Sequence, residues 1–194
     1  MSHIRCFAPV ADATAQVLIL GSMPGKESLR AGQYYAHPRN AFWKIMGDLV
    51  GAYPDLPYED RLHILKSSGI ALWDVLESCV RKTSLDSHIK EGTANNFQSF
   101  FLQHPNITQV FFNGAKAEQC FRKHVQVPPE SYSLQFCRLP STSPAHAGMS
   151  YENKLDAWRA IMQGVKLPPA KLVATSTGSG QAYWVSVSKA PIKP

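Results

Sequence analysis

The fold of this chain is decided by the segment Val17-Leu18-Ile19-Leu20-Gly21-Ser22-Met23-Pro24-Gly25. Its first four residues form a short apolar run, which is typical of a buried strand. The Gly and Pro residues that follow predict a turn leading the chain out of a sheet. The segment therefore reads as a strand that ends in a loop.

Strands and helices alternate along the rest of the chain. Apolar runs predict further strands at 70–73, 110–112 and 133–139. Apolar residues at helical spacing predict helices at 41–50, 58–67, 95–103, 115–124 and 151–162. Strands separated by helices imply a mostly parallel sheet covered on both faces. Ligands bind such sheets beyond the carboxyl ends of the strands, so the loops at that edge are where we expect a site.

The chain has 194 residues, of which 44% are hydrophobic, and this is enough for one domain with a proper core. Twenty Lys and Arg against fourteen Asp and Glu give a net charge of +6. That excess favours a polyanionic partner, with nucleic acid the first candidate. A basic protein without such a partner is the alternative.

The cysteines and histidines do not have the spacing of metal ligands. Cys6, Cys79, Cys120 and Cys137 are scattered, with no Cys-x-x-Cys pair. We therefore expect no metal or other cofactor, and buried, reduced thiols. The N-terminus has no long apolar stretch, and no segment approaches the ~20 apolar residues of a membrane span. We expect a protein of the cytoplasm (the bacterial nucleoid) or the nucleus, not secreted and with no membrane partner.

The composition changes near the C-terminus, so we expect an α/β domain at 1–164 and an appendage at 165–194. Lys166-Leu167-Pro168-Pro169 ends the last helix, and Ser, Thr and Gly dominate 175–180. Residues 182–188 alternate as in a strand. The appendage is interpreted as an edge strand or a flexible tail.

A second informative stretch is Gly32-Gln33-Tyr34-Tyr35-Ala36-His37-Pro38-Arg39-Asn40-Ala41-Phe42-Trp43. Connecting loops are usually small and polar, so these large aromatic groups indicate a binding surface. A nucleobase can stack on a ring, and a polar side chain can then address the base or a water. An aromatic plug over one end of the sheet is an equally good explanation.

Two loops carry a resemblance to a known family. GSMPG with the following GQYYAHPRNAFW resembles the first motif of the uracil-DNA glycosylase superfamily, and LPSTSPAHA at 139–147 resembles its other signature loop. Segments 71–75 and 111–117 also have family counterparts, so the likeness covers about residues 17–162. It is closest to the hypoxanthine-DNA (deoxyinosine) glycosylases and the mismatch-specific uracil/thymine glycosylases. Two matched loops in order are more specific than either alone.

The resemblance implies a three-layer α/β sandwich with a central, mostly parallel four-stranded sheet. It implies a monomeric, monofunctional DNA N-glycosylase of base excision repair. Such an enzyme flips a deaminated base out of double-stranded DNA and hydrolyses its C1′–N bond, leaving an abasic site. Hypoxanthine is the expected base. A uracil or G·T/U mismatch-directed glycosylase and a non-catalytic nucleic-acid-binding member of the fold remain alternatives.

Asn40 is the catalytic residue that the resemblance implies. A carboxamide can accept a hydrogen bond from a water and orient it without changing charge. The alternative is a cap for the helix that begins near Ala41. Tyr35 is expected to stack on the flipped base, the alternative being a tyrosine of the core.

Three further residues are expected at the base. Met23 stands where uracil-type relatives carry Asp or Asn. Because methionine cannot activate or orient a water, this favours hypoxanthine over uracil. Asp74, which follows a strand, would accept a hydrogen bond from a base N–H, of which hypoxanthine and uracil each present one; capping a turn is the alternative. Asn113 follows the next strand and is also expected to bind the base.

DNA contacts are expected from both loops. Hydroxyl and N–H groups of the second loop would bind phosphates, and its end lies where relatives insert a wedge into the base stack. The expected residues are His37, Arg39, Ser141, Thr142, Ser143, Ala145 and His146. The superfamily's catalytic His would align near Leu139 and is absent, so we expect other groups, such as backbone amides, to stabilise the leaving base.

Overall fold

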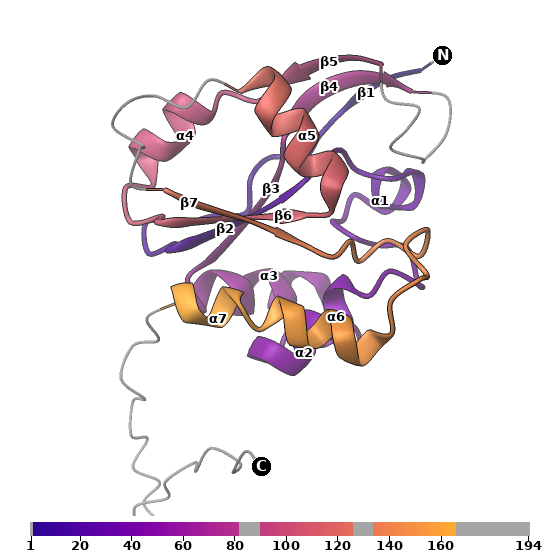
Figure 1. Cartoon of the computed structure of the whole chain (residues 1–194), viewed down its shortest axis with the longest axis vertical. Coiled ribbons are helices and arrows are strands. Elements are labelled where there is room, and N and C mark those ends of the chain that lie inside the picture. The colour runs from indigo at the N-terminus through magenta and orange to yellow at the C-terminus, as the bar shows by residue number, and fades with distance from the viewer. Residues whose placement is uncertain (1, 82–89, 126–133, 166–194) are drawn as a thin grey trace, which may run out of the picture.

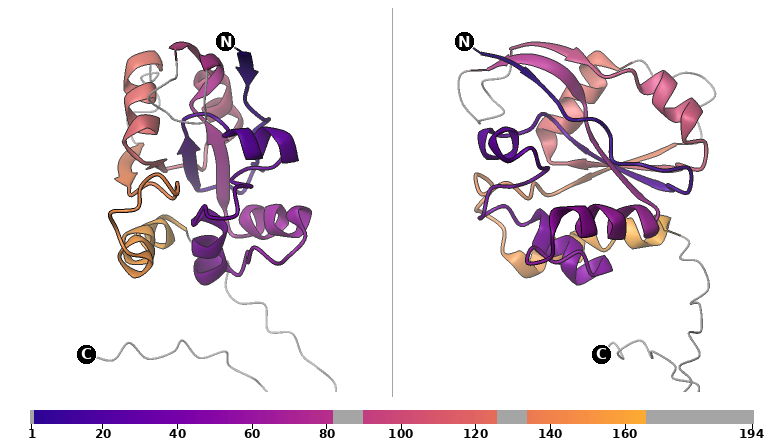
Figure 2. Two further views of the ribbon diagram at one scale, coloured as in Figure 1. Left: turned by 90° about the vertical axis from the view of Figure 1, so that its right-hand side faces the viewer. Right: turned by 180° about the vertical axis from the view of Figure 1, so that it is seen from behind.

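The computed structural model describes residues 2–81, 90–125 and 134–165, and these residues form three layers (Figure 1). A central sheet has helices α2, α3, α6 and α7 on one face. Helices α4 and α5 cover the other face, and a second, smaller sheet lies beside α5 on that same face. Both views in Figure 2 show the same layering, and α1 lies beside the sheet at one end of its strands.

The central sheet consists of β2 (Val17–Gly21), β3 (Ile70–Asp74), β6 (Gln109–Asn113) and β7 (Gln135–Leu139) in the order β3-β2-β6-β7. All three neighbouring pairs are parallel. Every residue of β2 and β3 is buried, as expected of strands covered on both faces. The α/β fold and the four-stranded parallel sheet that we predicted are confirmed.

Most predicted helices are present. They are α2 (Phe42–Val50), α3 (Tyr58–Ser67), α4 (Phe97–Gln103) and α5 (Ala115–His124). The single helix predicted at 151–162 is wrong, because the chain forms α6 (Tyr151–Trp158) and then α7 (Ile161–Gly164). At the break, the N–H groups of Met162 and Gln163 bond to carbonyls three residues back, which tightens the turn and interrupts the helix.

Four elements were not predicted. Strands β1 (Ser2–Arg5), β4 (Leu76–Arg81) and β5 (Lys90–Ala94) form an antiparallel sheet in the order β1-β4-β5. The register between β4 and β5 shifts twice, so neither strand has the regular alternation that a pattern search requires. Helix α1 (Lys26–Ala31) has only six residues, of which Ser28 alone is buried.

Two clusters of apolar side chains lie on opposite faces of the central sheet. The upper one contains Phe97, Phe100 and Phe121 from α4 and α5. The lower one contains Phe42 of α2 and Trp158 of α6. Together the two cores hold the sheet rigid between helices, so that its carboxyl edge is a firm base for loops.

Several further expectations concern this part of the chain. Cys79 and Cys120 are buried as predicted, but Cys137 is exposed on the edge strand β7. Val165, which we placed in the appendage, is 7% exposed and packs in the lower core; the strand predicted at 182–188 lies outside the described residues. None of the helices in the described ranges is long and apolar enough to cross a membrane.

Candidate active site

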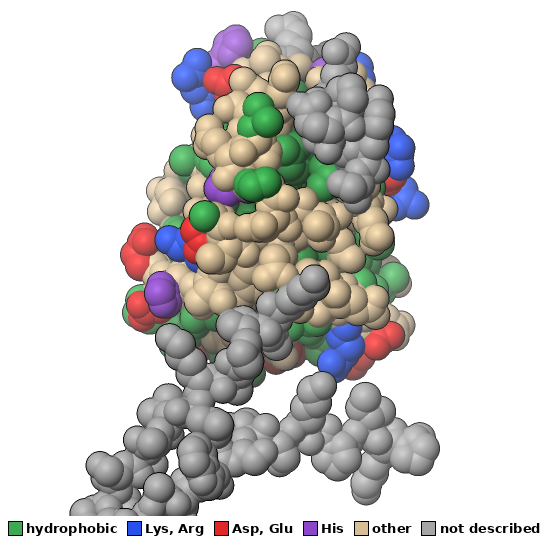
Figure 3. Space-filling view, turned by 90° about the vertical axis from the view of Figure 1, so that its left-hand side faces the viewer, with side chains coloured by type: hydrophobic (Ala, Val, Ile, Leu, Met, Phe, Trp, Pro, Cys, Tyr) green, Lys and Arg blue, Asp and Glu red, His purple; other side chains and the backbone are tan. Residues whose placement is uncertain are grey.

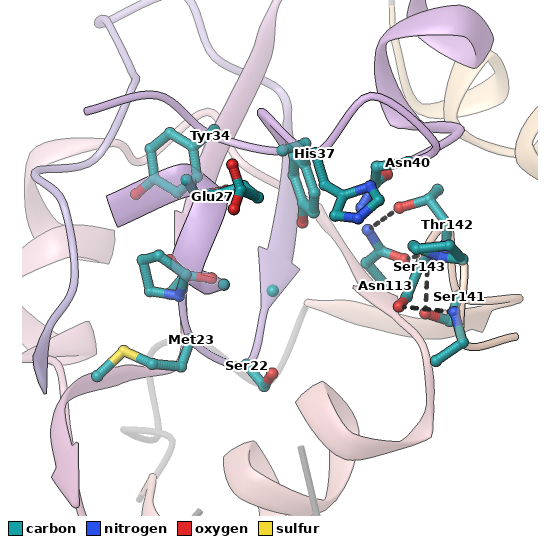
Figure 4. Close-up of a pocket in the computed structure, with 18 of the residues that line it drawn as sticks. Ser22, Met23, Glu27, Tyr34, His37, Asn40, Asn113, Ser141, Thr142 and Ser143 are labelled. Atoms are coloured by element: carbon teal, nitrogen blue, oxygen red, sulfur yellow. Dashed lines mark hydrogen bonds between the residues drawn. The ribbon is translucent and has the colours of Figure 1, made fainter. Parts of the chain in front are cut away.

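A cavity of about 410 Å³ opens at the carboxyl ends of the central strands (Figure 4). It is built by the loop after β2, the aromatic loop before α2, and the loop after β7. Of the residues predicted to form a site, all but the exposed Arg39 line this cavity. They are Met23, Tyr35, His37, Asn40, Asp74, Asn113, Ser141, Thr142, Ser143, Ala145 and His146.

The innermost part of the cavity depends on Gly21, the last residue of β2. Asp74 is paired in register with Gly21 on the neighbouring strand and is 3% exposed. A Cβ atom on Gly21 would collide with Asp74 Oδ1 and lie 3.1 Å from Tyr35 Oη. The absence of a side chain at Gly21 therefore lets a carboxylate and a phenol approach the same point of the backbone.

Tyr35 has a backbone conformation that is rare for its residue type. Its φ is 54°, in the left-handed region. Its ring stacks on Phe42, with centroids 4.0 Å apart and planes 23° apart. Because Phe42 covers one face of the ring, a base would have to stack on the opposite face. Tyr35 thus belongs to the core packing and to the cavity wall at once.

The peptide before Tyr35 is held by two helices. Tyr34 N–H donates to Tyr58 Oη of α3 at 2.9 Å, and Tyr34 C=O accepts from Trp43 Nε1 of α2 at 2.8 Å. Burial raises the pKa values of Tyr34 and Tyr58, which keeps both phenols neutral. The guanidinium of Arg61 lies 4.6 Å from the Trp43 ring centroid. Sequence patterns did not identify this clamp, which fixes the chain where the left-handed residue begins.

Asn40 lies one residue before Ala41, the N-cap of α2, so it is not itself the N-cap, although its side chain bonds to the start of the helix. Its Oδ1 accepts from the Phe42 N–H at 3.0 Å, so the carboxamide holds the first residue of α2. The same side chain lines the cavity. Its Nδ2 makes no hydrogen bond to the described part of the chain, and its Oδ1 has a second lone pair. Capping and water binding therefore do not exclude each other.

The side chain of Met23 is not directed at the part of the cavity where a base is expected. It is 6% exposed and packs in the upper core, although it also borders the cavity. In Figure 4 its thioether points away from Asn40 and Asn113. Met23 thus adds an apolar wall and no hydrogen-bonding group.

Thr142 joins the two signature loops. Asn113 Nδ2 donates to Thr142 Oγ1 at 2.8 Å, and Thr142 N–H donates to Asn113 Oδ1 at 2.9 Å. The Thr142 carbonyl accepts from Ala41 N–H at 3.0 Å. Thr142 is 1% exposed, so it holds the loop from inside and does not face a phosphate, contrary to our expectation. Asn113 likewise uses its carboxamide to position this loop.

The rest of the second loop is also internally bonded. Ser141 Oγ accepts from Ser143 N–H, and Ser143 Oγ accepts from Ala145 N–H, at 3.2 and 3.3 Å. Ala145 and His146 are exposed at the rim, where a wedge was expected. Lys154 of α6, which burial leaves with a lowered pKa, donates to the His146 carbonyl at 2.7 Å. No sequence pattern indicated Lys154, because a lysine in a helix is normally exposed.

His37 and Leu139 lie in contrasting surroundings. The imidazole of His37 lines the cavity, and its Nδ1 accepts from Arg39 N–H at 3.1 Å. Leu139 is 3% exposed and belongs to the lower core. Across the described ranges, no three His, Cys, Asp or Glu side chains are arranged to hold a metal ion.

Helix α1 contributes cavity residues that the sequence did not reveal. Glu27 lines the cavity and pairs with Arg30 at 2.6 Å. The hydroxyl of Ser28 accepts from Ala36 N–H at 3.3 Å and so ties α1 to the aromatic loop. A six-residue polar helix has no periodicity by which it can be found.

The chain is similar in sequence to two known proteins. The chain is 41% identical over 112 residues to a hypoxanthine DNA glycosylase of Methanosarcina barkeri, covering 57% of this chain and 71% of that protein. It is 34% identical over 160 residues to a hypoxanthine DNA glycosylase of Methanosarcina acetivorans, covering 82% and 98%.

A solved structure is also similar. It is the solution NMR structure of a protein from Methanosarcina acetivorans described as a candidate uracil DNA glycosylase. Its TM-score is 0.69 at 34% identity, and the match covers 84% of this chain and 98% of that one. The family model of the uracil DNA glycosylase superfamily matches residues 8–164. The chain therefore belongs to the uracil DNA glycosylase superfamily.

Proposed function

We propose that the protein is a DNA glycosylase that removes hypoxanthine from double-stranded DNA and leaves an abasic site. The observation that carries this proposal is the convergence of the Tyr35 ring, the Asp74 carboxylate and the Asn40 carboxamide on one cavity. The relatives named hypoxanthine DNA glycosylase support the choice of base. We further propose that the protein acts as a monomer.

The cavity is large enough for one extruded base. Its volume of about 410 Å³ lies in the usual range of small-molecule sites, roughly 300–1,000 Å³. The face of the Tyr35 ring opposite Phe42 gives the base a surface to stack on. Since the ring is backed by Phe42 and held by the Tyr34 clamp, it is rigid before the base arrives.

Asp74 supplies selectivity against the ordinary base adenine. An ionised carboxylate only accepts hydrogen bonds, and hypoxanthine presents an N1–H to it. Adenine carries a lone pair at N1, which would face the carboxylate with no hydrogen between them. Because Asp74 is 3% exposed, water cannot readily fill that gap, and adenine is disfavoured.

Asn40 directs the attacking water. Its Oδ1 accepts one O–H of a water and points the oxygen at C1′, while the Phe42 N–H holds the carboxamide in place. In the overall reaction the C1′–N bond breaks, the water oxygen bonds to C1′, and the base leaves with one more hydrogen. The transition state resembles that of glycoside hydrolysis.

The net charge of the chain fits a DNA partner. The net charge of +6 favours a polyanion. Figure 3 shows the opposite end of the molecule, where the Lys and Arg side chains of the described residues lie at the margins and do not gather into a patch.

The test is incubation with duplexes that carry deoxyinosine, deoxyuridine or a G·T mismatch, followed by alkali to cleave abasic sites. We expect cleavage of the deoxyinosine strand and no cleavage of a matched adenine duplex. Failure to release any of the three bases would overturn the proposal and favour a protein that only binds nucleic acid.

A further inference from the structure

The departing base needs a hydrogen-bond donor, because negative charge moves onto it as the C1′–N bond breaks. Backbone amides were among the expected donors, and the second loop borders the cavity. In the structure the N–H groups of Thr142, Ser143, Ala145 and His146 all bond to acceptors within the protein. These four N–H groups are therefore already used, and a side chain of the cavity wall is the better candidate for the donor.

His37 lies in the cavity wall with a defined tautomer. The Arg39 N–H donates to Nδ1 at 3.1 Å, and a ring nitrogen that accepts an N–H carries no proton. In the neutral imidazole the proton is therefore on Nε2. The His37 carbonyl accepts from Asn40 N–H at 2.8 Å, so the residue is tied to both of its neighbours in the loop. In Figure 4 the ring lies on the same side of the cavity as Asn40 and Asn113.

We propose that His37 is a catalytic residue whose Nε2–H donates a hydrogen bond to the leaving base. This inference rests on the proposed glycosylase function. The Nε2 proton stays on His37 throughout the step. The electron pair of the broken C1′–N bond passes to the base, which becomes an anion. The attacking water loses a proton to solvent, and solvent then protonates the departed base. Because the proton stays on Nε2, the charge of the imidazole does not change in the step.

Two replacements separate the two nitrogens of the ring. In His37→Asn the side-chain oxygen replaces Nδ1 and can accept from Arg39 N–H, since Asn readily bonds the N–H two residues on. That variant has no donor at the position of Nε2. In His37→Gln the longer amide puts an N–H near the position of Nε2 but does not replace the Nδ1 bond. The two variants therefore keep complementary halves of the residue.

The experiment measures single-turnover release of hypoxanthine from a deoxyinosine duplex at saturating enzyme, with DNA affinity titrated in parallel. We expect His37→Asn to lose roughly 10²- to 10³-fold in rate, as for removal of one transition-state donor, with unchanged affinity. We expect His37→Gln to remain within about tenfold of the wild type. Melting curves of both variants check that the loop is folded.

Three results would overturn the inference. Full activity of His37→Asn with loss in His37→Gln would mean that His37 only holds the loop through Nδ1. Weaker, more salt-sensitive DNA binding with unchanged single-turnover rates would make His37 a phosphate contact. An inactive wild-type protein would remove the proposed function and this inference together, and that case is recognised before any variant is made.

Discussion

Replacement of Asn40 by serine and by alanine separates two roles of its carboxamide, which are to bond to the Phe42 N–H and to orient the attacking water. Alanine removes the acceptor of the Phe42 N–H, which lies 3.0 Å from Oδ1. Loss of such a bond at the start of a helix costs about 1 kcal/mol, which lowers the melting temperature by roughly 2–4 °C in a domain of this size. Serine is a good acceptor at helix starts and should restore most of this stability.

Neither replacement restores the carboxamide that reaches the water. Both variants should therefore lose base release by about 10²- to 10⁴-fold, the usual worth of a positioned group that handles protons. DNA affinity should change little, because the residue is assigned to water and not to a phosphate. The assay is single-turnover release of hypoxanthine from a deoxyinosine duplex, with thermal melting and fluorescence anisotropy on the same samples.

The serine variant decides between the two roles. If it is as stable as the wild type but inactive, the carboxamide acts in catalysis. If Asn40→Ser is both stable and active, Asn40 is only a helix cap and the mechanism proposed above is wrong.

Three other predictions concern the cavity and its support. Tyr35→Ala should weaken binding of the flipped base by about 1–3 kcal/mol while Tyr35→Phe keeps most activity; equal losses in titrations of the two variants would show that the hydroxyl matters. Deoxyinosine should be processed faster than deoxyuridine in single-turnover assays, because Met23 offers no polar group; the reverse order would remove the hypoxanthine assignment but not the glycosylase class. Tyr58→Phe should lower the free energy of unfolding in urea by about 1–3 kcal/mol, since the Tyr34 N–H loses its acceptor; an unchanged midpoint would contradict the clamp.

Local patterns were sufficient for the central framework. Apolar runs predicted the four strands of the main sheet, and 3.6-residue periodicity predicted α3 and α5 with their observed ends. These patterns work because the central strands are buried on both faces and the helices on one, so burial determines the order of apolar and polar residues along each element. Placement of both signature loops at one edge then followed from parallel strands.

The hydrogen bonds that hold the site together could not be predicted from local sequence patterns. Tyr34 and Tyr58 are 24 residues apart, and Asn113 and Thr142 are 29 apart. Hydrogen bonds of this kind depend on how helices and loops meet in three dimensions, and each partner alone resembles an ordinary polar residue. For the same reason the sequence suggested Thr142 as a DNA contact, when it is an internal link between loops.

The left-handed backbone conformation of Tyr35 lowers the stability of the folded protein at a position where the side chain is proposed to be needed for activity. A side chain in that conformation costs roughly 1–2 kcal/mol, which glycine would avoid. Glycine would also remove the ring on which we propose that the base stacks. Selection for a more heat-resistant protein and selection for repair would therefore pull this position in opposite directions. Gains in thermal tolerance should instead accumulate away from the aromatic loop, where rigidity and base recognition do not compete.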